Sequence, residues 1–224
     1  DTVLSKMEDP EREGLWDTRG LVVGDVQSGK TTHYVTLANK AFDAGYKTVI
    51  ILSGMHNNLR AQTQQRIEEG IIGRDTINNQ KCGVGTLFNV EIEELQQFTT
   101  REEKGDYGVN KKNLHHLNGI IGVFKKNKRI LENIIDMAKQ FAEPKITNPN
   151  GGEPINAENA KVRNTPLLLI DDEADNASIN TAAAGATAST INKLIVELLN
   201  YFEKSAYIGY TATPFANILI DSSM

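Results

Sequence analysis

The chain has 224 residues, and its 24 lysines and arginines against 29 aspartates and glutamates give a formal net charge of −5. A chain of this length can bury a full hydrophobic core, and its single cysteine, Cys82, can form no internal disulfide. The lone thiol, with no apolar leader and no run of about 18 apolar residues, argues against secretion and membrane spanning, so we expect a cytoplasmic protein. Because the chain is mildly acidic, any nucleic-acid site has to be a local basic patch.

The first half of the chain alternates between predicted strands and helices. After a polar lead-in over residues 1–19, residues 21–23 predict a buried strand that opens into a glycine loop. Apolar residues at helical spacing over 34–42 predict a helix that ends at Gly45, residues 48–52 predict a second buried strand, and residues 59–67 a second helix. This alternation predicts an α/β fold with a mainly parallel sheet and helices on both faces.

The pattern loosens from about residue 80, where residues 84–88 suggest a strand and residues 90–98 a short helix. We expect residues 89–118 to be an inserted segment and residues 143–165 an exposed loop. Regular elements return as a strand over 120–124, a helix around 131–138, a strand over 167–170, a helix over 191–202 and a strand around 207–209. Residues 20–224 are therefore predicted to form one domain.

Residues 24–31 match the phosphate-binding pattern G-x-x-x-x-G-K-[ST], between a predicted strand and a predicted helix. In this pattern the glycines let the backbone wrap around an anion, and backbone N–H groups at the helix start face the phosphates. Lys30 would neutralise β- and γ-phosphate oxygens, and the Thr31 hydroxyl would bind Mg²⁺. The predicted ATP-binding residues are Gly24, Gln27, Ser28, Gly29, Lys30, Thr31 and Thr32. The alternative is a glycine turn with an incidental lysine.

A second group of chemically active residues follows the apolar strand at 167–170. The carboxyl ends of strands in an open α/β sheet are where ligands bind, and Asp172 and Glu173 lie just beyond such an end. Asp172 would hold Mg²⁺ through water and Glu173 would polarise the attacking water, with Asp171 as a cap or supporting partner. The alternative is a solvated helix start, where carboxylates are favoured by the helix dipole.

The phosphate loop, the Asp172-Glu173-Ala174-Asp175 box and Thr211-Ala212-Thr213-Pro214 resemble, in order, motifs one, two and three of superfamily-two helicases and translocases. The resemblance implies a RecA-like lobe with a particular strand order. The strand that ends in the threonine motif (the threonine strand) would lie between the strand before the glycine loop (the loop strand) and the strand before the acidic box (the acidic strand). Asp175, Thr211 and Thr213 would then couple the state of the γ-phosphate to movement. The lysine and the acidic box are 172 − 30 = 142 positions apart, a separation that the inserted segment accounts for.

Segments 24–31, 53–60, 169–178 and 207–217 narrow the resemblance to the bacterial Z-one domain, whose members are helicase-like proteins often labelled putative endonucleases. The resemblance implies an ATP-driven motor on DNA, encoded beside restriction, methylation or phage-defence genes whose products are candidate partners. It also implies a second RecA-like lobe in a longer protein, and we expect this chain to be a piece of that protein. We expect the piece to bind nucleotide weakly and to hydrolyse it very slowly, because the arginine finger comes from the second lobe.

Related motors contact the nucleic-acid backbone just past the second strand, where Asn58, Arg60 and Gln62 could donate to phosphates. An ordinary helix start with polar surface residues is the alternative. Two basic groups, around residues 111–116 and 125–129, are either a DNA-facing patch or a solvated face. The four histidines have no metal-binding spacing, and Trp16 is either a stacking partner for adenine or a core aromatic.

Three other functions remain open on the residues alone. A P-loop kinase would use the same loop, but it gives no account of the acidic box followed by the threonine motif. A metal-dependent endonuclease has little support, since no lysine follows Glu173 at nuclease spacing. A catalytically inactive DNA-binding module would have no need of intact ATPase motifs.

Overall fold

The computed structural model describes residues 2–25, 29–87, 95–107, 114, 119–143, 160–174 and 190–212. They contain a six-stranded sheet in the order β1-β6-β5-β2-β4-β3, in which every neighbouring pair is parallel. The strands are β1 (Trp16–Val23), β2 (Thr48–Ser53), β3 (Gln96–Gln97), β4 (Ile120–Lys125), β5 (Leu167–Asp172) and β6 (Lys204–Thr211). The predicted α/β class with a parallel sheet is confirmed.

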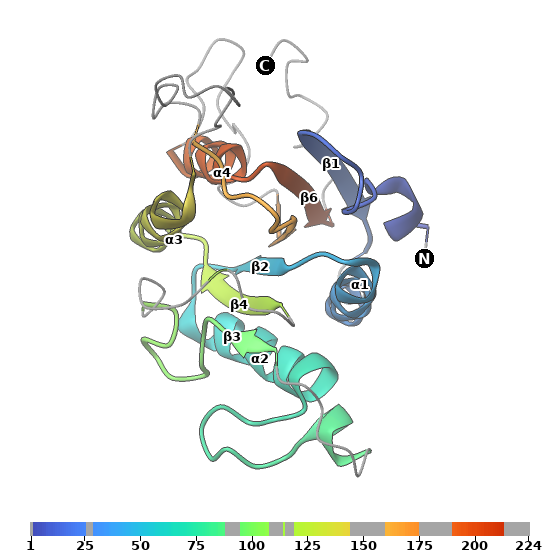
Figure 1. Ribbon diagram of the computed structural model, residues 1–224. Coiled ribbons are helices and arrows are strands. Elements are labelled where there is room, and N and C mark those ends of the chain that lie inside the picture. The colour runs from blue at the N-terminus through green and yellow to red at the C-terminus, as the bar shows by residue number, and fades with distance from the viewer. Residues whose placement is uncertain are drawn as a thin grey trace, which may run out of the picture.

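Helices cover both faces of this sheet (Figure 1). On one face lie α1 (Lys30–Ala44) and the end of α2 (Asn57–Ile67), which continues into the π-helical turn η2 (Glu68–Ile72). The other face carries α3 (Lys128–Phe141) and α4 (Thr190–Tyr201). Two short 3₁₀ turns, η1 (Leu4–Lys6) and η3 (Gly83–Thr86), lie outside these layers. As predicted, α1 ends at Gly45, which has the left-handed φ of 108° that favours glycine.

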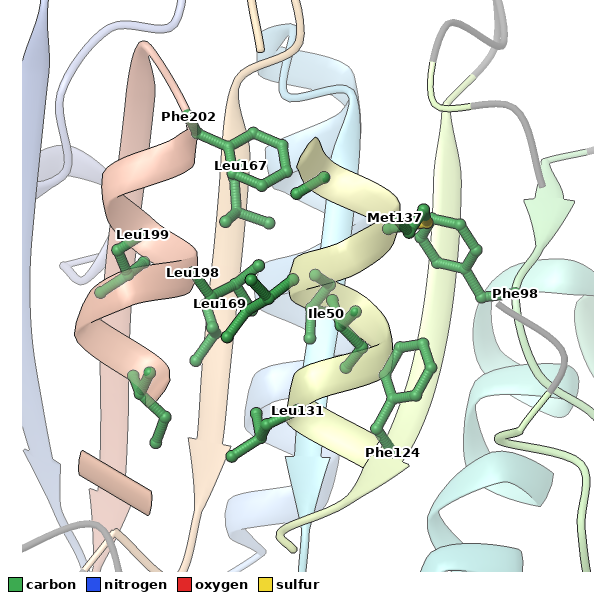
Figure 2. Close-up of a cluster of buried hydrophobic side chains, with 14 of the residues drawn as sticks. Ile50, Phe98, Phe124, Leu131, Met137, Leu167, Leu169, Leu198, Leu199 and Phe202 are labelled. Atoms are coloured by element: carbon green, nitrogen blue, oxygen red, sulfur yellow. The ribbon is translucent and has the colours of Figure 1, made fainter. Parts of the chain in front are cut away.

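The central strands are buried on both sides, as their unbroken apolar sequences predict. Alternate side chains of a strand point to opposite faces, so Ile50 packs with α3 and α4 while Ile51 packs with α1. Figure 2 shows the first of these two cores, with Leu131 and Met137 of α3 and Leu198 of α4 packed over the sheet. The two cores hold the strands in one rigid layer, and this layer fixes the position of the loops at its edge.

Several predicted boundaries are wrong. The polar lead-in is shorter than the predicted residues 1–19, because strand β1 already begins at Trp16 and runs beside β6 as far as Val23. Residues 83–86 form a 3₁₀ turn instead of a strand, and Gln96–Gln97 lie in β3, so the end of the expected helix over 90–98 is extended. The expected loop over residues 143–165 is not exposed throughout, because Val162 is fully buried. The inserted segment over residues 89–118 is also packed in part, because Asp106 is fully buried.

Candidate functional site

The predicted motifs meet at the carboxyl edge of the sheet. Because all the strands are parallel, they end at the same edge, and the register pairs Val23 with Thr211 and Asp172 with Tyr210. The Gly24 N–H also donates to the Thr211 carbonyl at 3.0 Å. The predicted position of the threonine strand, between the loop strand and the acidic strand, is confirmed by the order β1-β6-β5.

The glycine loop leads from β1 directly into α1. Gly29 precedes the first helical residue and has a φ of 79°, a left-handed conformation that L side chains rarely adopt. The residue after it, Lys30, begins the helix, and among the described residues no side chain caps its N-terminus. The first N–H groups of a helix have no partner within the helix, so an anion could accept from them at the place where the motif predicts a phosphate. Gln27 and Ser28 lie outside the described residues.

The Lys30 side chain folds back over the loop. Its Nζ donates to the carbonyl oxygens of Gly24 and Asp25, each at 3.0 Å. These contacts keep the ammonium half-buried beside the loop and close to the start of α1. Thr31, the next residue, is also half-buried, whereas Thr32 is exposed.

Tyr34 links the start of α1 to the acidic motif. Its hydroxyl donates to Asp172 Oδ2 at 3.2 Å, across 138 positions of sequence. Burial and the charge of Asp172 raise the pKa of Tyr34, while hydrogen bonding with the hydroxyls of Thr31 and Thr63 opposes the rise. Thr31 and Asp172, the two predicted magnesium ligands, thus converge on one hydroxyl group.

The environment of Asp172 suits a divalent cation. Burial is the main cause that raises the pKa of Asp172, and the nearby charges of Glu173 and Asp171 raise it further. The hydrogen bond from Tyr34 and the charge of Lys126 lower it. Among the described residues no group of three or more His, Cys, Asp or Glu side chains could hold a metal alone. Mg²⁺ commonly uses one or two protein oxygens together with water and phosphate oxygens, which fits a Thr31 hydroxyl and one carboxylate.

Beyond β5 the chain turns sharply at Glu173. This residue has a φ of 57°, and the next N–H, that of Ala174, donates to the Tyr210 carbonyl at 2.8 Å. The Glu173 side chain is exposed, and its Oε2 lies over Gly54 at the end of β2, 3.5 Å from the position that a Cβ on Gly54 would occupy. A Cβ at position 54 would be crowded by Leu59 Cδ1 at 3.0 Å, whereas its distance to this carboxylate is an ordinary van der Waals contact. Glu173 therefore presents an exposed carboxylate at the same edge as Lys30.

Asp171 has a different role from its two acidic neighbours. Its side chain is fully buried and forms a 2.6 Å ion pair with Lys126, and the Tyr207 hydroxyl donates to Asp171 Oδ2 at 2.8 Å. Since it does not face the edge, it supports the turn. In the sequence Lys126 belongs to the basic group at residues 125–129. This group is not a continuous patch, because Lys125 and Lys126 are buried while Lys128 and Arg129 are exposed. Residues 111–113, 115 and 116 lie outside the described residues.

A pocket of about 480 Å³ opens beside the loop. It continues from Gly29 along one side of α1 and is closed by Val3 and Leu4 of the lead-in. The helix supplies Thr32, His33, Thr36, Leu37 and Lys40 to its wall. The pocket therefore combines apolar side chains with hydroxyl and charged groups next to the predicted phosphate position. Trp16 does not line it, because Trp16 packs edge-on against Tyr46 in the core at a ring separation of 6.0 Å.

The three predicted nucleic-acid contacts have different environments. Asn58 and Gln62 are exposed on α2, which is consistent with the prediction. The prediction for Arg60 is wrong, because its side chain is fully buried and donates to the carbonyls of Thr100 and Glu102 at 2.8 and 2.5 Å. Arg60 shares a helical face with Thr63, Gln64 and Ile67, all buried, and this spacing is the signal that could have identified it as internal.

Asp175 and Thr213 lie outside the described residues, so their predicted coupling roles stay predictions. Thr211 is fully buried at the end of β6.

No protein-family model matches the chain, and comparison with curated proteins finds no match either. Within the part of the chain that the structure describes, none of the helices has the length and apolar character needed to cross a membrane.

Proposed function

We propose that this chain is the ATP-binding, RecA-like lobe of a nucleic-acid-dependent ATPase of the helicase or translocase kind. One observation carries the proposal: at the edge where β6 lies between β1 and β5, the Tyr34 hydroxyl joins the start of α1 to Asp172 at 3.2 Å. This arrangement brings Lys30, the half-buried Asp172 and the exposed Glu173 to one sheet edge, which supports the proposal. If the protein were a P-loop kinase, the strand β6, which ends at Thr211 in the middle of the site, would have no role.

The triphosphate would lie across the N-terminus of α1. Lys30 would exchange the carbonyls of Gly24 and Asp25 for β- and γ-phosphate oxygens, which are stronger acceptors because they are charged. Thr31 and Asp172 would hold Mg²⁺, which supplies neutralisation of phosphate charge when bound. The nucleoside would occupy the pocket beside Gly29, with its base against Val3 and Leu4.

Glu173 would act as the general base. Its carboxylate would accept a hydrogen bond from the water that attacks the γ-phosphorus and would take one proton from that water. As the new P–O bond forms, the bond to the β-phosphate oxygen breaks and its electron pair leaves with ADP. The products are ADP and inorganic phosphate, and Glu173 releases the proton to solvent.

The choice of DNA as the polymer rests on the resemblance to Z-one proteins, as do a second lobe and partners from restriction or phage-defence systems. The exposed Asn58 and Gln62 at the start of α2 support a polymer track past β2. Without the second lobe we expect slow hydrolysis, because an arginine finger supplies about 10³ to 10⁵ in rate in related phosphoryl-transfer systems.

Calorimetric titration with Mg²⁺-ATP tests the proposal on three proteins. The wild-type chain should bind, Lys30→Ala should lose binding, and Glu173→Gln should bind as the wild type does but hydrolyse more slowly. Equal binding by wild type and Lys30→Ala would contradict the assignment of the phosphate loop. Metal-dependent DNA cleavage that survives Lys30→Ala would favour the endonuclease, and phosphate transfer to a nucleoside would favour the kinase.

A further inference from the structure

Lys126 is a buried cation that contacts residues 171–173, which we call the acidic turn, at the end of β5. It follows the last residue of β4, and its side chain is 1% exposed. The Lys126 backbone N–H donates to the Ser53 carbonyl at 3.2 Å, at the end of β2. In the strand order β5-β2-β4, its side chain therefore reaches across the end of β2 to the acidic strand.

Three oxygen atoms on consecutive residues surround the Lys126 ammonium. Asp171 Oδ1 lies at 2.6 Å, the Asp172 carbonyl oxygen at 3.0 Å and the Glu173 carbonyl oxygen at 2.7 Å. An ammonium group has three N–H donors, so one side chain can engage three successive residues of the turn. Lys126 therefore holds both the start of the turn and its backbone.

The backbone that Lys126 holds is unusual at Glu173. A φ of 57° is left-handed, and non-glycine residues rarely adopt it unless the surroundings impose it. The Glu173 carbonyl belongs to the residue with this conformation, and Lys126 Nζ donates to it. The same conformation sets the direction of the Glu173 side chain over Gly54.

We propose that Lys126 is a positioning residue that holds Glu173 in its left-handed conformation, so that the Glu173 carboxylate stays aligned at the edge of the sheet. Lys126 does not face the pocket, so its effect on catalysis passes through Glu173 and Asp172. The catalytic part of this inference rests on the proposed ATPase function.

The charges around Asp172 agree with this role. Asp172 is flanked by two carboxylates on its own segment, Asp171 and Glu173, and by the Tyr34 hydroxyl from α1. The charge of Lys126 acts against the two carboxylates and lowers the pKa of Asp172. Replacing Lys126 with a neutral residue removes this cation together with its three contacts and should release the turn.

The neighbouring lysine supplies a matched control. Lys125 is also buried, but its Nζ donates to Asn57 Oδ1 at 2.7 Å and lies 3.5 Å from Asp106 Oδ1, away from the acidic turn. Lys125→Met and Lys126→Met remove the same charge from adjacent positions. If the contacts of Lys126 with the acidic turn are required for catalysis, the two variants should differ in their rate of ATP hydrolysis.

The test measures single-turnover ATP hydrolysis, with protein in excess, and Mg²⁺-ATP affinity for both variants. Lys126→Met should hydrolyse about 100-fold more slowly than the wild type, as displaced catalytic groups do. Its affinity should change by less than threefold, and Lys125→Met should keep the wild-type rate within about threefold. A Lys126→Met protein that folds and hydrolyses at the wild-type rate would overturn the inference.

A second variant covers the case in which Lys126→Met fails to fold because Asp171 is left as an unpaired buried charge. Lys126→Met with Asp171→Asn removes both charges, and the asparagine oxygen can still accept from Tyr207. This double variant should fold and should hydrolyse as slowly as Lys126→Met is expected to. A wild-type rate in the double variant would again overturn the inference.

A further readout does not depend on ATP. A crystal structure of the double variant should show that Glu173 has left the left-handed region. If the wild type binds no Mg²⁺-ATP, the proposed function fails, while this measurement still decides whether Lys126 holds the turn. An unchanged Glu173 conformation would rule that out.

Discussion

The Tyr34 hydroxyl donates to Asp172 Oδ2 at 3.2 Å, and this contact joins the first helix to the acidic strand. Asp172 is thereby held at the sheet edge although burial and two neighbouring carboxylates disfavour its charge. A partly buried charge of this kind is expected to lower folding stability in exchange for function.

Asp172→Asn should therefore stabilise the protein at neutral pH. The pKa of Asp172 is raised in the folded state, so its contribution to stability is full below the pKa of the unfolded chain and is lost as the pH rises through the folded pKa. The gain from Asp172→Asn should be present at pH 7 and should vanish near pH 3, while the asparagine oxygen still accepts from Tyr34. Urea unfolding at both pH values measures this, and a stability gain of equal size at pH 3 and pH 7 would contradict it.

Arg60→Ala should strongly destabilise the fold. The Arg60 guanidinium is fully buried, donates to two backbone carbonyls and lies 3.9 Å from Asp106 Oδ2. Removing one partner of a buried ion pair typically costs about 3 to 5 kcal/mol, so we expect a loss of about 3 kcal/mol in the free energy of unfolding. Gln62 lies two residues further along α2 but on its exposed face. Gln62→Ala should therefore change the free energy of unfolding by less than about 0.5 kcal/mol in the same urea titration. Similar losses in both variants would mean that the Arg60 contacts contribute little.

The exposed face of α2 is the predicted nucleic-acid contact. The double variant Asn58→Asp with Gln62→Glu places two negative charges there and should weaken binding of labelled single-stranded DNA about tenfold or more at low salt. Fluorescence anisotropy at two salt concentrations measures the effect, which should shrink at high salt. Gln140→Glu adds one negative charge on the exposed side of α3, away from α2, and this control should bind as the wild type does. Equal weakening by the control would indicate a general effect of charge.

Two left-handed glycines separate a binding effect from a folding effect. Gly29 has a φ of 79° and Gly45 a φ of 108°, and alanine at either position forces an L side chain into this region. Each substitution should lower the free energy of unfolding by about 1 kcal/mol. Only Gly29→Ala should also weaken Mg²⁺-ATP binding in calorimetry, because Gly45 is at the far end of α1. Weaker binding in both variants would point to a general loss of structure.

The pocket beside α1 is tested by filling it. Thr36 is exposed and lines the pocket, so Thr36→Trp should occupy the space proposed for the nucleoside without touching the loop. We expect ATP affinity to fall about tenfold or more, while the affinity for inorganic tripolyphosphate stays unchanged. Calorimetric titration with the two ligands measures this difference. Equal losses for both ligands would argue that the pocket is not the nucleoside site.

The sequence by itself indicated the alternation of strands and helices, since short runs of apolar and β-branched residues at 48–52, 120–124 and 167–170 are typical of strands covered on both faces. It also predicted which motifs meet at the edge, because parallel strands end together and each motif lies at or just beyond the end of a strand. The position of Thr211 between the loop strand and the acidic strand was expected from the resemblance and is observed in the strand order.

Only the tertiary structure decided which charged residues are internal. Lys126 and Arg60 look like surface cations in sequence, because a one-dimensional pattern of charges does not show which partners the fold brings near. Both are buried, since oxygen atoms from segments far away in the chain surround them: Asp171 lies 45 positions beyond Lys126 (171 − 126), and the carbonyls of Thr100 and Glu102 lie at least 40 positions beyond Arg60 (100 − 60). A buried cation is stable only where such partners converge, and that convergence is a property of the packed sheet edge.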